Sequence, residues 1–92
     1  LLITWQPPRY PNGNIRGYFL TFENSTTGNV EETYVLYRQL YYLYEEAEPD
    51  TGYKVSVWAE TNGGEGAKVM RAVRTWPFRS SLVSLLIFLS FK

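Results

Sequence analysis

The sequence predicts an all-β protein built as a sandwich of two sheets. Short runs that alternate between apolar and polar residues recur along the chain, and clusters of Pro, Gly and Asn separate them. Eight tyrosines, five phenylalanines and three tryptophans among 92 residues favour strands, in which aromatic side chains pack well. No long stretch follows the period of an amphipathic helix. A chain of this size is expected to form one domain.

The first strand is predicted at residues 1–6, where Ile3 and Trp5 share one face. It ends at Pro7-Pro8, because proline cannot donate to a sheet ladder. Residues 10–14 follow as a turn, in which an Asn-Gly pair supplies positive-φ positions. The chain opens on this strand pattern without a charged leader, as expected of an excised or processed fragment.

The second strand is predicted at residues 15–23. Its alternation separates an inward set from an outward set, namely Tyr18, Leu20 and Phe22 against Phe19, Thr21 and Glu23. Residues 24–29, with the sequence NSTTGN, form a loop. Residues 30–46 are rich in tyrosine and are predicted as two short strands with a break near residues 38–40, rather than as one helix.

The clearest strand pattern begins at Tyr53, directly after the sequence EPDTG. One face carries Tyr53, Val55, Val57 and Ala59, and the other carries Lys54, Ser56, Trp58 and Glu60. The glycine-rich residues 61–66 follow as a flexible loop. The last strand is predicted at residues 67–76, before Pro77.

Composition excludes several functional classes. The chain has no histidine and no cysteine, so it has no disulfide framework, no thiolate nucleophile, no Ser-His pair and no cysteine-ligated metal. A formal net charge of zero argues against a dedicated nucleic-acid binder. Glu45 and Glu46 would point to opposite faces of a strand and would not converge for acid-base catalysis. We therefore expect neither an enzyme nor a cofactor site.

Several dispersed motifs together resemble a fibronectin type III domain. They are Trp5 followed by Pro7-Pro8, the run NGNIRGYFLTF, and PDTGYKVSVWAETNGGEG followed by VRTWP, all within residues 1–77. The resemblance implies an immunoglobulin-like sandwich of two sheets. It also implies a structural corner, formed by Pro49, Thr51 and Tyr53, before the strand that the family calls F. In this corner the tyrosine hydroxyl is hydrogen-bonded to upstream backbone.

The chain departs from the family pattern in three places. Ala47 stands where the family usually has leucine, so the corner is expected to be less tightly packed. The family's first strand, strand A, is missing upstream of Trp5, which leaves a sheet edge unpaired unless another segment covers it. Residues 78–92 match nothing in the family. We therefore divide the chain into a domain at residues 1–77 and an apolar C-terminal tail at residues 78–92.

Three hypotheses for this tail remain open. Its alternation, with an apolar phase at Val83, Leu85, Ile87, Leu89 and Phe91, is that of a strand with a buried face. Such a strand would dock on the sandwich where strand A is missing. The uncharged run is too short for the ~20 residues of a membrane span, but it also fits the start of a truncated one. The third hypothesis is a non-native extension.

The resemblance also implies a function. Members of the family are extracellular spacer and ligand-binding modules, common in adhesion proteins and in receptors such as receptor tyrosine phosphatases. This implies a non-catalytic interaction or spacer module at the cell surface, with a protein ligand or neighbouring domains as partners and with membrane attachment only through the parent protein. The alternative is an accessory module of a secreted multidomain enzyme.

Candidate sites follow from the motifs. Asn24-Ser25-Thr26 is an N-glycosylation acceptor sequence on a predicted loop. Phe19 and Trp58 lie on the outward phase of strands that are neighbours in the family, so they form either a docking patch or a local cluster covered by arginines of the last strand. Because Trp58 is outward by phase, Trp58→Ala is expected to cost little stability compared with Trp5→Ala.

The remaining candidates are loop and strand residues. The candidate interaction surface comprises Phe19, Trp58, Asn62, Gly63, Gly64, Glu65, Arg71 and Arg74. The glycine-rich loop lacks the lysine and the helix of a phosphate-binding loop, but loops at the ends of sandwiches carry recognition. Residues 67–79 carry four basic side chains and no acid, which fits either a heparin-like polyanion site or an ordinary solvated edge. Tyr44, beside acids, is either a sulfation site or a packed tyrosine.

Overall fold

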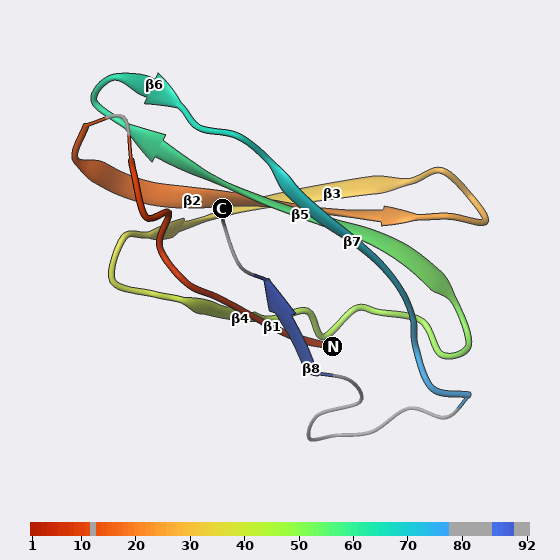
Figure 1. Cartoon of the computed structure of the whole chain (residues 1–92). Coiled ribbons are helices and arrows are strands. Elements are labelled where there is room, and N and C mark those ends of the chain that lie inside the picture. The colour runs from red at the N-terminus through yellow and green to blue at the C-terminus, as the bar shows by residue number, and fades with distance from the viewer. Residues whose placement is uncertain (12, 78–85, 90–92) are drawn as a thin grey trace.

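The computed structural model describes residues 1–11, 13–77 and 86–89, and within them all regular structure is β-strand (Figure 1). The first sheet has the order β4-β1-β8, formed by β1 (Leu2–Trp5), β4 (Tyr41–Leu43) and β8 (Leu86–Leu89). The second sheet contains β2 (Ile15–Asn24), β3 (Val30–Leu36), β5 (Gly52–Thr61), β6 (Gly64–Glu65) and β7 (Val69–Arg74). In this sheet β5 pairs with β2, β6 and β7, and β2 also pairs with β3. The predicted two-sheet, all-β sandwich is confirmed. Among the described residues, no helix has the length and hydropathy needed to cross a membrane.

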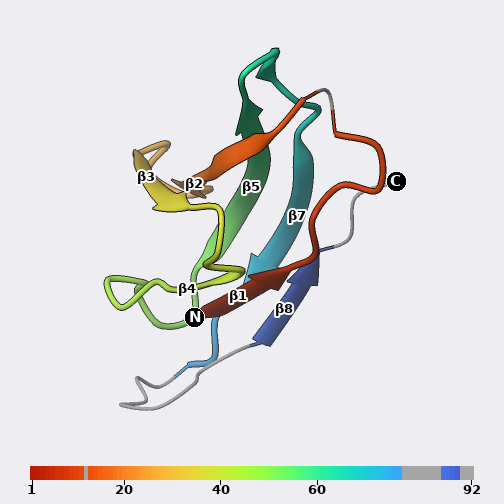
Figure 2. The same cartoon turned by 90° about the vertical axis from the view of Figure 1, so that its left-hand side faces the viewer.

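The core lies between the two sheets, which face each other in Figure 2. The inward phases of β2 and β5 supply most of it, as the alternation predicted, with Tyr18, Leu20, Phe22, Tyr53, Val55, Val57 and Ala59 all at most 2 % exposed. From the other sheet, Ile3 and Trp5 are equally buried, and the Trp5 ring meets Tyr18 edge to face at 5.4 Å. Full burial of a Val, Leu, Ile or Phe side chain in this set stabilises the fold by about 1.5–3 kcal/mol through its removal from water.

The tyrosine-rich segment forms two strands with a break, as predicted. β3 ends at Leu36, where the backbone N–H of Gln39 donates to the Leu36 carbonyl at 2.9 Å and turns the chain. β4 begins at Tyr41 and pairs antiparallel with β1 in the opposite sheet. The break therefore carries the chain from one sheet to the other.

At the end of the second sheet, the glycine-rich residues 61–66 form a hairpin connection. Within it β6, which the sequence did not predict, pairs with the end of β5. The Thr61 hydroxyl donates to the Gly64 carbonyl and accepts from the Gly63 N–H, both at 3.0 Å, while Gly64 adopts a φ of 116° that L side chains rarely adopt. The register of β7 against β5 is offset by one residue from that of β6, so residues 66–68 form a bulge.

The edge of β1 remote from β4 is paired with β8 (Figure 1). The two strands run parallel, from Leu2 opposite Leu86 to Trp5 opposite Leu89. A segment of the C-terminal tail thus lies at the position where the family would have strand A. The other residues of the tail, and the alternating side chains on which its hypotheses rest, lie outside the described part of the chain.

Candidate interaction site

The corner before β5 is built around the Tyr53 hydroxyl. The ring is 2 % exposed, and its hydroxyl oxygen accepts a hydrogen bond of 2.7 Å from the backbone N–H of Glu48. The Thr51 hydroxyl donates to the carbonyl of Pro49 at 2.8 Å. The three residues that the resemblance assigned to the corner are thus brought together, and their polar groups satisfy backbone groups of the turn.

Thr75 belongs to the same corner, although the sequence did not single it out. This side chain is 5 % exposed; its hydroxyl accepts from the N–H of Thr51 at 2.9 Å and donates to the carbonyl of Glu48. Its partners lie more than twenty residues upstream, so no local pattern marks it. Only the position of a threonine directly after the last strand, in VRTWP, hints at this role.

Asn24 is the last residue of β2 and shapes the hairpin that leads to β3. Its side-chain Oδ1 accepts hydrogen bonds from the backbone N–H groups of Thr26 at 2.9 Å and Thr27 at 3.2 Å. Asn24 itself is half-buried, whereas Ser25 and Thr26 are exposed. The turn thus uses the amide oxygen, while an N-linked glycan is carried by the amide nitrogen.

Three aromatic rings lie side by side on the outer face of the second sheet. We call Tyr34, Phe19 and Trp58 the aromatic ladder, because the register places them directly opposite one another on β3, β2 and β5. Phe19 stacks on Trp58 with ring centroids 5.4 Å apart, and meets Tyr34 edge to face at 4.8 Å. Such aromatic pairs each contribute about 0.5–1.5 kcal/mol beyond the area they bury.

The Tyr34 ring lies across Gly17 to reach Glu60. The Tyr34 hydroxyl donates to Glu60 Oε1 at 2.9 Å, and a Cβ atom on Gly17 would lie 2.3 Å from this hydroxyl oxygen and 2.4 Å from Cζ. Glycine at this position therefore allows the ring to cross β2. Burial, followed by the hydrogen bond to Glu60, raises the pKa of Tyr34 above its ordinary value.

Trp58 is outward by phase but is not exposed. Its side chain is 5 % exposed, because the Lys68 ammonium lies 4.2 Å above the ring centroid and Phe19 covers the ring from the next strand. The indole N–H donates to Glu65 Oε1 at 2.6 Å. The premise of the low cost expected for Trp58→Ala, that the outward phase leaves the ring uncovered, is therefore wrong. The expected cover by arginines is also wrong, because the bulge at residues 66–68 brings Lys68 over the ring instead.

The tip of the β5–β6 hairpin is tied to the loop at residues 6–14. Asn62 Oδ1 accepts from the backbone N–H of Asn14 at 2.9 Å, and the Asn62 N–H donates to the Asn14 carbonyl at 3.3 Å. A Cβ atom on Gly13 would lie 2.2 Å from Asn62 Oδ1, so the approach requires glycine. Gly63 and Gly64 are exposed at the tip. The hairpin tip and the loop at residues 6–14 thus form one end of the sandwich, which we call the joined loop end.

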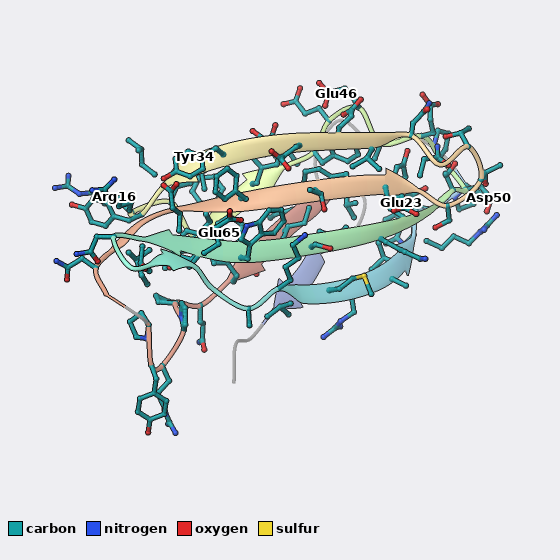
Figure 3. The ribbon with its side chains drawn as sticks, turned by 90° about the horizontal axis from the view of Figure 1, so that it is seen from above. Arg16, Glu23, Tyr34, Glu46, Asp50 and Glu65 are labelled. Carbon is teal, nitrogen blue, oxygen red and sulfur yellow. The ribbon has the colours of Figure 1, made fainter. Side chains whose placement is uncertain are left out.

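Arg71 and Arg74 do not join the aromatic ladder or the hairpin tip. Arg71 lies opposite Val55 and Arg74 opposite Gly52, so the two arginines are on opposite faces of β7. Arg74 Nε forms an ion pair with Asp50 Oδ1 at 2.9 Å. Figure 3 shows Asp50 at the opposite end of the sandwich from Tyr34 and Glu65. The eight residues of the candidate surface are therefore in separate places rather than on one surface.

Tyr44 is a packed tyrosine. The ring is 5 % exposed and stacks on Phe22 with centroids 4.2 Å apart. Burial, followed by a hydrogen bond to Glu31, raises the pKa of Tyr44 well above its ordinary value of 10. The alternative of a sulfated Tyr44 would require an accessible hydroxyl. The sequence predicts Glu45 and Glu46 in a strand, but they lie in a turn after β4.

The described part of the chain contains no group of three Asp, Glu, His or Cys side chains placed to hold a metal ion. Its carboxylates also have structural partners at several points: Glu60 binds Tyr34, Glu65 binds Trp58 and Asp50 binds Arg74. These three carboxylates therefore hold neighbouring side chains in place.

Comparisons with known proteins agree with this architecture. The chain is 29% identical over 77 residues to neogenin of Homo sapiens, an alignment that covers 84% of the chain and 5% of neogenin. It is 31% identical over 75 residues to netrin receptor DCC of Homo sapiens, which covers 82% of the chain and 5% of that receptor. The chain thus spans a small fraction of the length of these relatives.

The family model of the fibronectin type III domain matches residues 1–75, from the start of the first sheet to the corner residue Thr75. This range contains both halves of the corner, the aromatic ladder and the joined loop end. The chain therefore belongs to the fibronectin type III domain family.

Proposed function

We propose that residues 1–77 act as a non-catalytic interaction or spacer module in the extracellular part of a cell-surface receptor. The observation that carries this proposal is the similarity of most of the chain to segments of neogenin and of a protein named as a netrin receptor. The composition supports it, because a chain without histidine or cysteine lacks the usual catalytic bases and thiol nucleophiles.

The partner in this proposal is a protein ligand or a neighbouring domain of the same chain. The joined loop end offers a surface for it, since the hydrogen bonds between Asn62 and Asn14 hold the hairpin tip against the preceding loop. Tyr10, in that loop, is 83% exposed, and exposed tyrosines are common at binding interfaces. In the aromatic ladder on the outer face, Trp58 is covered and therefore supports the sheet rather than serving as a contact surface.

N-glycosylation at Asn24 provides the test of the extracellular location. NST is the one acceptor triplet in the sequence, and it begins the exposed β2–β3 hairpin loop. The full-length protein should be produced in eukaryotic cells with a secretory pathway, and its mobility compared before and after enzymatic removal of N-glycans. We expect a glycan on the peptide that contains Asn24.

Variants of Thr26 make this test specific. Thr26→Ala removes the acceptor sequence but keeps Asn24 and its hydrogen bonds to the hairpin backbone, whereas Thr26→Ser keeps the acceptor sequence. The glycan should be absent from the first variant and present in the second. An unmodified Asn24 in a protein that carries glycans elsewhere would count against this site alone. A full-length protein without any glycan that stays inside the cell would contradict the proposed location.

A further inference from the structure

β3 is the outermost strand of the second sheet (Figure 2). It pairs with β2 over its whole length, from Val30 opposite Glu23 to Leu36 opposite Gly17, without a shift in register. Among the described residues, no strand pairs with its other side. The outer side of β3 is therefore a regular strand edge of seven residues.

The hydrogen bonds at the two ends of the ladder fix which backbone groups face outward. The Tyr37 N–H donates to the Arg16 carbonyl, and the Asn24 N–H donates to the Asn29 carbonyl. In an antiparallel pair, hydrogen-bonded positions alternate, so the odd-numbered residues of β3 bond to β2. The backbone groups of Val30, Glu32, Tyr34 and Leu36 then point away from the sheet. Within the described part of the chain, the Leu36 carbonyl alone among these outward groups has a backbone partner, the N–H of Gln39.

Among the usual devices that block a strand edge, β3 has only charged side chains, Glu31 and Glu32. The sequence VEETYVL contains no proline and no lysine, and the strand has no bulge. Val30 and Leu36, which share the outer face, are 57% and 68% exposed. The edge therefore combines free backbone groups with two apolar side chains that a further strand would cover.

The charge on β3 itself is acidic. The strand carries Glu31 and Glu32 and no basic residue, while Arg16 and Arg38 lie at its C-terminal end. The Glu31 carboxylate is hydrogen-bonded to the Tyr44 hydroxyl, whereas Glu32 is exposed, and no contact of its carboxylate is found among the described residues. A second copy of β3 would add further acids to the same edge. A strand with basic side chains would instead meet charges of opposite sign.

We propose that the β3 edge is a docking site for an extended segment of a partner protein that carries Lys or Arg at alternate positions. The segment adds to the sheet antiparallel to β3, with main-chain hydrogen bonds to Val30, Glu32 and Tyr34 and to the Leu36 N–H. A basic side chain lies opposite Glu32, and an apolar side chain lies opposite Val30. This inference rests on the proposed function as an interaction module, and gives it a surface and a partner chemistry.

A synthetic peptide tests the site directly. The peptide acetyl-VTRTKTV-amide places lysine opposite Glu32 when it pairs antiparallel over residues 30–36. Amide hydrogen exchange of the ¹⁵N-labelled chain should be followed by NMR as this peptide is added. We expect exchange to slow at Glu32, Tyr34 and Leu36, and to stay unchanged at Glu31, Thr33 and Val35, which already bond to β2. Uniform protection, or none, overturns the proposal.

Charge is tested with a matched peptide and two variants. The peptide acetyl-VTETETV-amide should bind about two- to fivefold more weakly for each reversed pair. Glu32→Lys should reverse this preference, whereas Glu65→Lys makes the same change in net charge on β6, which lies beyond β2 and β5 from β3, and should leave the order of the peptides unchanged. Equal binding of both peptides to the unaltered chain contradicts the basic partner.

Two further outcomes are distinguished by the same experiment. Slower exchange at the same amides without peptide, increasing with protein concentration, would show that a second copy occupies the edge and would overturn the assignment of a basic partner. In the second outcome, the full-length protein is glycosylated at Asn24 and reaches the cell surface, but the peptide leaves amide exchange at β3 unchanged. That result rejects this inference and leaves the proposed function in place.

Discussion

At the scale of single residues, two contacts form because a glycine without a Cβ atom makes room for a side chain from elsewhere in the chain. Tyr34 reaches Glu60 only because Gly17 has no Cβ, and the joined loop end exists only because Gly13 leaves room for Asn62. The sequence shows these glycines but not what lies over them, because the rings and amides that fill the space come from other strands. Their role is therefore a property of the fold.

Gly17→Ala should destabilise the domain by about 1–3 kcal/mol, because the new Cβ would overlap the Tyr34 ring and the Val35 carbonyl. Urea denaturation gives the change in the free energy of unfolding. Gly52→Ala is the matched control, since a Cβ there has its nearest contact at 3.6 Å from Ser25. Similar stability of the two variants would show that Tyr34 does not lie over Gly17.

Trp58→Ala should cost about 3–5 kcal/mol, comparable with Trp5→Ala, because both indoles are buried. Lys68→Gln should cost about 0.5–1 kcal/mol through loss of the cation–π contact alone. Trp76→Ala, at a site 46% exposed, provides a control that should cost much less. A Trp58 variant as stable as the Trp76 variant would mean that the cover over Trp58 contributes little.

Tyr44 should make the domain sensitive to alkaline pH. Its pKa is raised in the folded state, so the folded protein keeps the phenol proton at pH values where the unfolded chain has begun to release it. This contribution is complete below the ordinary pKa of 10 and is lost as pH rises above it, by at most about 1.4 kcal/mol per pH unit. Chemical denaturation from about pH 9 to about pH 11.5 should show this decline. Tyr44→Phe should flatten it, and parallel curves would contradict the assignment.

At the scale of elements, the sequence predicts strands well where one side chain in two is buried. β2 and β5 follow the alternation closely because their inward and outward faces differ so clearly. The last strand, predicted at residues 67–76, contains β7, but the prediction misses β6 and the bulge, which depend on how residues 64–74 pair with β5. A one-residue offset in register leaves no mark in local composition, yet it places Lys68 over Trp58.

Deletion of residues 78–92 should destabilise the domain and promote self-association. β8 pairs with the edge of β1, and its removal would expose the backbone groups of that edge to another chain. Urea denaturation and sedimentation analysis measure the two effects. A truncated chain that is equally stable and monomeric would show that β8 contributes nothing to the fold. Glu32→Lys in the truncated chain should not reverse the association, because β3 is at an edge of the other sheet.

At the scale of the whole molecule, both signs of charge occur toward each end of the 41 Å sandwich. Figure 3 places Arg16 and Glu65 toward one end and Glu23 and Asp50 toward the other. Arg74 pairs with Asp50, and Lys54 lies opposite Glu23. Neither end presents charge of one sign alone, so any charge-guided association depends on local side chains such as Glu32 and should weaken with added salt.

The fold class could be predicted because alternation and turn residues are local signals, and the corner of Pro49, Thr51 and Tyr53 because the resemblance to the family implied it. The candidate surface could not, because its members were grouped by strand phase and charge alone. Phase shows the face on which Arg71 or Trp58 lies, but not which side chain covers it or which acid pairs with it. Those contacts depend on strand order and register.

The central claim is that this fibronectin type III domain faces the outside of the cell, and labelling of Lys54 tests it most directly. Lys54 is exposed on β5, so a membrane-impermeant amine reagent should reach it in a full-length protein at the cell surface. The fraction of Lys54 that is modified should be measured by mass spectrometry on intact cells and on permeabilised cells. The account predicts equal labelling in both. Labelling of Lys54 only after permeabilisation would contradict it.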